Sequence, residues 1–375
     1  MAHFIRGTAP AEKEKTPLKH SRDISHEYLR TSKMAPYKGK PGSNKPIIAR
    51  DDFSKGNGDV QRFHFMPQDK SEGIKGQNKT IKGNEKSLED FWMDLRIDQM
   101  AKAFKKVGKM TDIRTIWKFR EQAKMQLVNW WKLWDDIWMI DALTGKLTNA
   151  FDYMTETEFY NAVLTNGLGR CMVAVGSTGA KILDEAEIAI SSNKLLGTAS
   201  GSGGLGMTDA DTMNSYVLDE IGVMVGDGVG KYNIEPVQMA NGEERYILLI
   251  DRVARKNLRQ DTRFEKHMLS IIEGGHKDDP IASGAMGMWD NIIIKCVDGL
   301  SRSKSADGKY YTRNLLLGAN ALGVGWEQHQ DYTEELEDHK RILSCASDEI
   351  RGQTKITFDG VDMGVAQIIT STNNT

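Results

Sequence analysis

MQLVNWWKLWDDIWMIDALTG, residues 125–145, holds four of the eight tryptophans of the chain, at positions 130, 131, 134 and 138. Aromatic side chains dominate the energetics of cores and interfaces because each one buries a large apolar area. Four indole rings within nine residues present more apolar area than packing against a single sheet normally requires. This segment therefore needs apolar partners from other parts of the chain or from another molecule.

Residues 112–143 around this segment have the pattern of a long amphipathic helix. Thr111 or Asp112 is a candidate N-cap, and Gly145 follows the last apolar residue. At 1.5 Å per residue, the helix would be about 48 Å long. Its wide apolar face carries the side chains that we expect to pack, which are Trp117, Leu127, Trp130, Trp131, Trp134 and Trp138.

Two interpretations of these tryptophans are open. In the first, every ring lies in the core of the subunit, as is usual for an aromatic stripe at helical spacing. In the second, the helix is a spine that is covered on both sides. Asp136 and Asp141 lie five positions apart, so they do not face each other on a helix. We interpret them as solvated ends of a core helix and find no catalytic constellation.

Residues 58–99 have the pattern of a long hairpin. Apolar and polar side chains alternate around Phe63 and again around Leu95, as they do in β-strands. Between these strands lie about twenty polar residues, 67–87, with five lysines and only two large apolar side chains. A two-stranded hairpin is marginally stable alone in water, so one that projects this far needs a surface to lie on. The alternative is a mobile loop.

The first 50 residues differ in composition from the rest. They contain 11 Lys+Arg against 4 Asp+Glu and five of the eight prolines, although the whole chain has a net charge of -2. A segment with so many prolines and few large apolar side chains cannot form a packed core of its own. We expect an extended arm that lies on another surface or stays disordered, with nucleic acid as a nonspecific partner of its basic side chains.

The remaining pattern mixes helices and strands without a regular βαβ alternation, which predicts an α+β fold. The sequence Asn241-Gly242 between two strand-like runs is a strong hairpin signal. The other expected elements are helices beginning near Thr155 and at the capping box Thr208–Asp211, a helix over about 252–271, and strands near 170–175, 291–297, 354–358 and 364–372.

Several classes of function lack a supporting motif. The loop Gly201–Gly206 satisfies G-x-G-x-x-G, but no strand precedes it, as a dinucleotide fingerprint requires. A soluble enzyme that binds a phosphate-containing ligand at this loop is the alternative function. The histidines and the three separate cysteines lack metal-ligand or disulfide spacing, so we expect no metal, no cofactor and a reducing environment. No apolar run is long enough to cross a membrane, and no signal peptide is evident.

Seven blocks of the sequence, which cover about 320 residues, carry a resemblance to a known family. The blocks are DDFSKGNGDVQRFHFMPQ, TIKGNEKSLEDFWMDLRIDQMAKAF, REQAKMQLVNWWKLWDDIWMIDALTG, RYILLIDRVARKNLRQD, PIASGAMGMWDNIIIK, NLLLGANALGVGWEQ and TKITFDGVDMGVAQIITST. No single block is a functional signature, but in this order they resemble the major capsid proteins of tailed bacteriophages of the podovirus type. The departures from the family lie in the arm and in residues 194–206.

This resemblance implies the Hong Kong 97 (HK97) capsid fold, in which an arm, an extended loop, a peripheral domain and an axial domain follow one another. The tryptophan helix would be the spine helix of the peripheral domain. The implied parts are the N-terminal arm at 1–50, the extended hairpin loop at 51–108, the peripheral domain at 109–165 and 346–375 with the spine helix at 112–143, and the axial domain at 166–345.

The resemblance also implies a structural role without catalysis. The chain would be a subunit of an icosahedral capsid, in which hexamers and pentamers form the shell around a double-stranded DNA genome. Its location would be the virion, after synthesis and assembly in the host cytoplasm. Its partners would be its own copies, a separate scaffolding protein, a portal, a decoration protein and, nonspecifically, the packaged DNA. The loop side chains expected to take part in assembly are Lys70, Ile74, Lys75, Lys79, Ile81 and Lys82.

Overall fold

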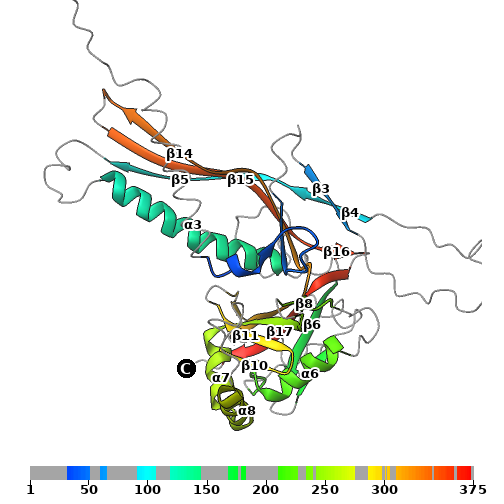
Figure 1. Ribbon diagram of the computed structural model, residues 1–375. Coiled ribbons are helices and arrows are strands. Elements are labelled where there is room, and N and C mark those ends of the chain that lie inside the picture. Colours follow the sequence, from blue (N-terminus) through cyan, green and yellow to red (C-terminus); the bar gives the residue numbers. More distant parts are fainter. Residues whose placement is uncertain are drawn as a thin grey trace, which may run out of the picture.

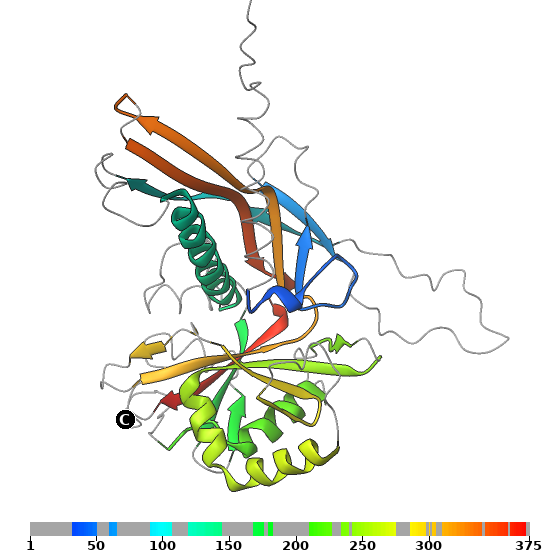
Figure 2. The same ribbon diagram turned by 60° about the vertical axis from the view of Figure 1, so that its left-hand side comes forward.

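The structure is a computed structural model of the chain. It divides into a long curved sheet with one helix lying along it and a second, larger sheet with three helices (Figures 1 and 2). It describes residues 32–50, 60–65, 91–106, 119–144, 168–175, 179–182, 210–226, 234–239, 242–274, 286–297, 300, 302–304, 310–339, 342–358 and 361–372.

The smaller main sheet has five strands in the order β1–β2–β14–β15–β5. β14 and β15 form an antiparallel hairpin of unusual length, since strands in globular proteins usually have roughly 3–10 residues. β5 pairs antiparallel with β15, whereas β2 pairs parallel with β14. The strands are β1 (Lys38–Gly39), β2 (Ile47–Arg50), β5 (Asp98–Lys106), β14 (Leu322–Glu337) and β15 (Ile342–Lys355).

Helix α3 (Phe119–Leu143) lies along one face of this sheet and contacts β5, β14 and β15 (Figure 1). It ends within the range that the sequence predicts, and the earlier part of the predicted helix, residues 112–118, lies outside the described residues. The predicted spine helix is therefore present over its described length, with the tryptophan segment in its second half.

The larger sheet has ten strands, seven of which follow the order β10–β11–β9–β13–β17–β6–β7. β12, β16 and β8 pair with β13, β17 and β9 respectively. The strands are β6 (Leu168–Val175), β7 (Gly179–Ile182), β8 (Val237–Gln238), β9 (Glu244–Ile250), β10 (Gly287–Trp289), β11 (Ile292–Cys296), β12 (Arg302–Lys304), β13 (Tyr310–Leu317), β16 (Thr357–Phe358) and β17 (Val361–Thr372).

Both faces of the larger sheet are buried. Successive strand side chains point to opposite faces, so Ile247 and Leu249 belong to one hydrophobic cluster, and Leu248 and Ile250 to another. Three helices pack on the second face, which is the lower side in Figure 1. They are α6 (Ser215–Gly226), α7 (Arg252–Gln260) and α8 (Thr262–Gly274).

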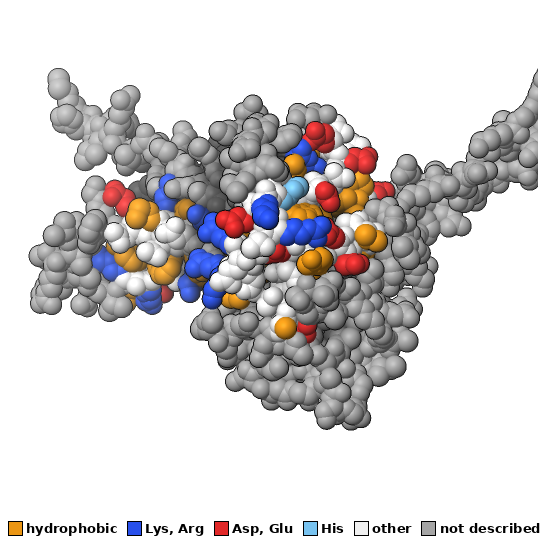
Figure 3. Space-filling view, turned by 90° about the horizontal axis from the view of Figure 1, so that it is seen from below, with side chains coloured by type: hydrophobic (Ala, Val, Ile, Leu, Met, Phe, Trp, Pro, Cys, Tyr) orange, Lys and Arg blue, Asp and Glu red, His pale blue; other side chains and the backbone are white. Residues whose placement is uncertain are grey.

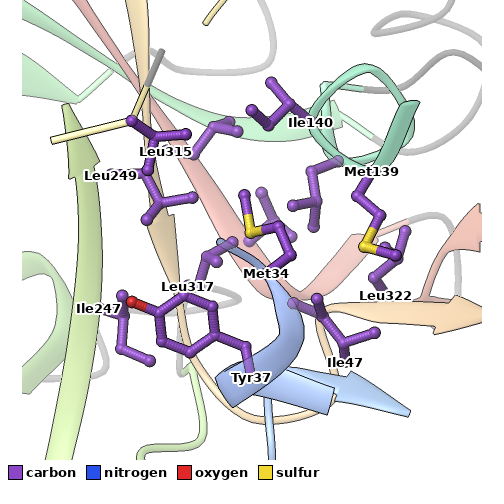
Figure 4. Packing of buried hydrophobic residues seen from close by; sticks show 14 of the residues in the cluster. Met34, Tyr37, Ile47, Met139, Ile140, Ile247, Leu249, Leu315, Leu317 and Leu322 are labelled. Carbon is purple, nitrogen blue, oxygen red and sulfur yellow. The ribbon is translucent and has the colours of Figure 1, made fainter. Parts of the chain in front are cut away.

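The first face of the larger sheet meets the end of α3 in a core shared by both sheets. Figure 4 shows Met34 between Tyr37, which lies next to Ile247, and the side chains of Met139 and Ile140, with leucines from the strands around them. Each of these five side chains is at most 1% exposed. Met34 precedes a short 3-10 helix, η1 (Ala35–Tyr37), and Tyr37 ends it, so the chain before β1 contributes directly to this core.

That observation corrects the predicted arm boundary. The sequence predicts an extended arm over residues 1–50, but residues 32–50 form η1, β1 and β2 and are built into the subunit. The physical reason is that a segment too short for a core of its own can still insert its few apolar side chains into a core formed by others. Residues 1–31 lie outside the described residues.

The predicted hairpin base is confirmed as a separate two-stranded sheet. β3 (Val60–Phe65) pairs antiparallel with β4 (Phe91–Arg96), and the predicted tip at 67–87 lies outside the described residues. Leu95 is fully buried beside Ile48 and Ile356 and anchors the hairpin to the body. At Gly352 of β15, a Cβ atom would lie 2.3 Å from the Arg96 carbonyl oxygen, so only glycine allows this close approach.

The sheet membership of the last strands differs from the predicted division at residues 345/346. β14 and β15 pair along almost their whole length, so a boundary there would cut through β15. β17, placed in the peripheral domain by the resemblance, pairs with β13 and β6 in the larger sheet. The buried ion pair of Lys355 and Asp362, 2.7 Å apart, lies where the chain passes from one sheet to the other.

Two predicted helices also differ in detail. The helix expected over 252–271 is broken at Asp261 into α7 and α8, because the Asp261 carboxylate accepts bonds from the backbone amides of Arg263 and Ser215. The helix expected from the capping box at 208–211 begins at Ser215 instead, where the Asn214 side chain accepts a bond from the Val217 amide at 3.0 Å. The predicted hairpin at Gly242 is confirmed by β8 and β9.

Candidate assembly site

The inner face of α3 is held to the long sheet by Trp131. Its ring is completely buried, and its Nε1 donates a hydrogen bond to Ser347 Oγ of β15 at 3.1 Å. Leu127, also completely buried, belongs to the same cluster, with Tyr332 and Cys345 on the sheet side. Burial and the nearby thiol raise the pKa of the Tyr332 phenol, so it stays neutral.

The four clustered tryptophans contact one another along the helix. The centroids of Trp130 and Trp131 are 4.9 Å apart in an edge-on arrangement, and those of Trp134 and Trp138 are 5.6 Å apart. Trp131 and Trp138 are buried, whereas Trp130 and Trp134 are half-buried. Lys102 of β5 lies 5.8 Å from the Trp130 ring centroid, a cation–π distance. The four rings therefore form one continuous set of contacts that extends from the buried, sheet-facing side of the helix to its half-buried side.

An ion pair lies at the centre of the contact between α3 and β15. Asp135 and Arg351 are both completely buried and bond each other, and Lys38 of β1 bonds the second Asp135 oxygen at 3.2 Å. Burial alone would raise the pKa of Asp135, but the charges of Lys38 and Arg351 outweigh it and lower the pKa. Residues from three distant parts of the chain thus meet at one carboxylate.

Asp136, the next residue, faces the segment before β1. Its carboxylate accepts bonds from Ser32 Oγ at 2.7 Å and from the backbone amides of Lys33 and Met34 at 3.3 and 3.2 Å. Burial raises its pKa despite these bonds. The prediction that Asp136 is a solvated helix position is therefore wrong, because it is 6% exposed and anchors residues 32–34.

A third buried carboxylate, Glu349, completes this polar cluster. It accepts bonds from Trp326 Nε1 at 2.5 Å and Gln330 Nε2 at 2.6 Å, and it lies 3.7 Å from Arg351. Burial raises its pKa, although Arg351 acts in the opposite direction. In the sequence, the adjacent Asp135 and Asp136 inside an apolar helix indicate a buried polar cluster. No local pattern identifies the residues of β14 and β15 that bond to it.

The outer face of α3 is not covered by any described residue. Met125 and Leu133 are each 57% exposed, and Asn129 between them is exposed as well. Their spacing of four residues places them along one side of the helix. These two large apolar side chains flank the polar Asn129 and are accessible for contact with another molecule. We call Met125, Asn129 and Leu133 the outer stripe of α3.

Several other residues predicted to act in assembly or binding are not among the described residues. Trp117, the loop side chains at positions 70–82 and the glycine loop at 201–206 lie outside the described residues. No cluster of three or more potential metal ligands occurs among the residues that the structure describes. Within the same residues, no helix is long and apolar enough to cross a membrane.

A family model described as "phage capsid protein" matches residues 18–373 of the sequence. The chain belongs to the phage capsid protein family. This family is structural, so the protein is a component of the virion capsid and not an enzyme, and the alternative of a phosphate-binding enzyme is excluded.

Several solved structures share the fold of this chain. The capsid protein of Ralstonia phage GP4 has 22% identity and a TM-score of 0.69, with 90% of each chain covered. The capsid protein of cyanophage Pam1 has 19% identity and a TM-score of 0.65, covering 93% of this chain and 94% of the other. A head protein of Helicobacter pylori bacteriophage KHP40 has 15% identity and a TM-score of 0.62, covering 90% and 91%. A search of curated proteins finds no match. The fold of this phage capsid protein is therefore HK97-like.

Proposed function

We propose that this capsid protein builds the icosahedral shell by forming hexamers and pentamers that enclose double-stranded DNA. The observation that carries the proposal is the outer stripe of α3, in which two large apolar side chains, Met125 and Leu133, are exposed on the long helix without cover from the described part of their own subunit. In this proposal, part of the N-terminal arm (1–50) or of the extended hairpin loop (51–108) of a neighbouring copy covers the stripe. Assembly takes place in the host cytoplasm.

Weak contacts repeated many times suit a closed shell. Identical subunits joined head to tail form rings when the rotation between them closes. Segments that become ordered on docking lose conformational entropy, which keeps each contact weak and correctable. The loop side chains Lys70, Ile74, Lys75, Lys79, Ile81 and Lys82 and the spine tryptophans, Trp117 included, are the proposed assembly and packing residues.

The capsid protein is also expected to have partners other than its own copies. A separate scaffolding protein and a portal are expected to act during assembly, and a decoration protein is a further expected partner. The basic side chains at the start of the chain contact packaged DNA without sequence specificity, through phosphate charge alone. We propose that the long sheet with α3 is the peripheral domain and the larger sheet with α6–α8 the axial domain.

Deletion of residues 67–87 tests the role of the loop. We expect a folded monomer that forms no shells, as measured by sedimentation velocity and negative-stain electron microscopy beside the full chain. A milder variant, Leu133→Glu, tests the outer stripe, and Gln126→Glu adds the same charge to an exposed position of the same helix as a control. Normal shells from both the deletion and Leu133→Glu would refute this mode of assembly.

A further inference from the structure

One side of helix α7 carries only positive charge. Four cations and no carboxylate occur in its nine residues, at spacings of three and four that place them on one side of the helix. Ala254 and Leu258 are buried on the opposite side. The four cations, which we call the basic face, line a recess of about 610 Å³ together with Gln260 and Cys296. They are Arg252, Arg255, Lys256 and Arg259.

A second recess, of about 690 Å³, has the opposite charge. Asp219, Glu244 and Asp290 line it, and no Lys or Arg occurs among the described residues of its wall. Glu244 and Asp290 are exposed, whereas Asp219 is held by Arg263 at 2.5 Å and by Trp289 Nε1 at 3.0 Å. We call this the acidic recess. Figure 3 shows Lys and Arg side chains gathered near the centre-left of the lower surface, with Asp and Glu mainly toward the right.

The two surfaces lie at opposite ends of the same pair of strands. β9 and β11 are parallel, and their first residues, near Glu244 and Ile292, line the acidic recess. Their last residues lead to the basic face, since Cys296 ends β11 and α7 begins directly after β9. At about 3.3 Å per residue, the length of β11 separates them by roughly 13 Å. A rigid sheet therefore holds a positive and a negative surface apart in one subunit.

We propose that the basic face of one copy docks against the acidic recess of the next copy, head to tail. This inference rests on the proposed function, because it names one contact within the rings. A heterologous contact of this kind requires two different, complementary surfaces on each subunit. Four cations facing the exposed carboxylates of Glu244 and Asp290 give that complementarity, and such charge pairing sets the register and the partner.

The second copy fits this surface better than nucleic acid does. DNA would be attracted by the basic face alone and would leave the acidic recess without a role. The recess also contains an apolar side chain, Val223, that is 50% exposed, and Tyr216, 47% exposed, lies two turns earlier on α6. Arginine stems can cover such apolar surface while their guanidinium groups bond carboxylates. A protein partner uses every one of these features.

Charge reversal of the basic face is the first test. We expect Arg255→Glu with Arg259→Glu to raise the protein concentration needed for ring or shell formation at least about tenfold, equivalent to about 1.4 kcal/mol per contact. The control is Arg255→Lys with Arg259→Lys, which keeps the charge and should assemble like the unmodified chain. Circular dichroism melting confirms that both variants remain folded.

A compensating change sharpens the test. Glu244→Lys with Asp290→Asn neutralises the acidic recess, and Asn suits position 290 because the backbone φ there is +47°. Without further changes, these two substitutions should impair assembly as the charge reversal on α7 does. Combined with the α7 reversal in one chain, it should restore assembly toward the unmodified level, because surfaces in contact are not additive. If the losses of assembly caused by the two double variants simply add in the combined chain, the proposed contact is wrong.

A crosslinking readout does not require closed shells. A zero-length carbodiimide joins Lys256 to a carboxylate within bonding distance, and a mixture of ¹⁴N- and ¹⁵N-labelled chains distinguishes links between copies from links within one. We expect hybrid-mass links from Lys256 to Glu244 or Asp290. Oligomers without these links would overturn the contact and leave the shell function standing. A chain with neither oligomers nor links would overturn both.

The electrophoretic mobility of a short DNA duplex distinguishes the proposed contact between copies from DNA binding by the basic face. If the α7 reversal abolishes DNA retardation but assembles normally, the basic face binds the phosphate backbone and the proposed contact between copies is wrong. If the reversal impairs assembly while DNA retardation persists, the contact between copies is supported.

Discussion

The two halves of helix α3 are buried in different ways. The half from Asp135 to Leu143 is enclosed on several sides by β15, by the larger sheet and by residues 32–50. The half from Phe119 to Trp134 rests on the long sheet by one face only (Figure 1), and its outer stripe is exposed. The tryptophans lie where the helix passes from the one environment to the other.

This difference shows two ways of attaching one helix. The enclosed half uses aliphatic side chains and buried charges whose partners come from distant segments. The half on the sheet uses wide aromatic rings, because a single helix crossing an extended sheet has few neighbours and each ring covers a large area. The enclosed half should therefore respond to loss of charge partners, and the other half to loss of ring area.

The largest effect is expected at the inner ring. Trp131→Ala removes a completely buried indole and a hydrogen bond to Ser347, and should lower the free energy of unfolding by about 3–5 kcal/mol. Trp134→Ala, at a half-buried ring, should cost only about 1–2 kcal/mol because less apolar area is lost. Urea unfolding followed by circular dichroism measures both. Equal losses of unfolding free energy at the two positions would contradict the distinction between the buried ring of Trp131 and the half-buried ring of Trp134.

A similar loss is expected from breaking the ion pair in the enclosed half. Arg351→Met leaves Asp135 buried with Lys38 alone and should cost about 3–5 kcal/mol. The matched double variant, Asp135→Leu with Arg351→Met, should recover much of that stability, since the Asp135 carboxylate is removed together with its main partner. The same urea titration compares them. A loss below about 1 kcal/mol for Arg351→Met would mean that the pair contributes as little as a surface pair.

A smaller, pH-dependent effect is expected at Glu349. Its raised pKa means that the folded protein binds this proton more tightly than the unfolded chain, whose Glu pKa is about 4.3. Stability from this group is therefore lost as the pH rises from about 4.3 through the folded pKa. Glu349→Gln cannot titrate, so its stability relative to the unmodified chain should increase with pH over that window. Melting temperatures from pH 4 to 8 test the slope.

The lowered pKa of Asp135 acts in the opposite direction. Its contribution is present above the unfolded Asp pKa of about 3.9 and is lost only as the pH falls through the lower folded value. Below about pH 4, both Glu349→Gln and the unmodified chain should therefore lose stability together. A variant curve parallel to the unmodified curve across pH 4 to 8 would contradict the role given to Glu349.

The smallest effect on the subunit is expected on the outer stripe. Leu133→Ala should change the free energy of unfolding by no more than about 0.5 kcal/mol, because the side chain is 57% exposed. Shell yield, measured by sedimentation, should nevertheless fall, since the stripe is proposed to contact a neighbouring copy. A loss of stability comparable to that of Trp134→Ala would place Leu133 in the subunit core instead.

Local patterns predicted the elements well where the side-chain period is clear. The spine helix, the strands around Phe63 and Leu95 and the hairpin at Gly242 all follow from periods of 3.6 or 2 and from turn chemistry. The pattern failed at Asp136 and at residues 32–50, because a polar residue or a proline-rich segment is buried only when others complete its bonds and contacts.

The sequence by itself determined the spine helix with its apolar face and the strands around Phe63 and Leu95, because these features depend on residues within a few positions of one another. Only the tertiary structure decided which carboxylates are buried, since Asp135 bonds Lys38 and Arg351, 97 and 216 positions away. It also decided that β17 joins the larger sheet and that a basic and an acidic surface lie at opposite ends of two parallel strands. Long-range pairing depends on the whole packed chain, and no local period encodes it.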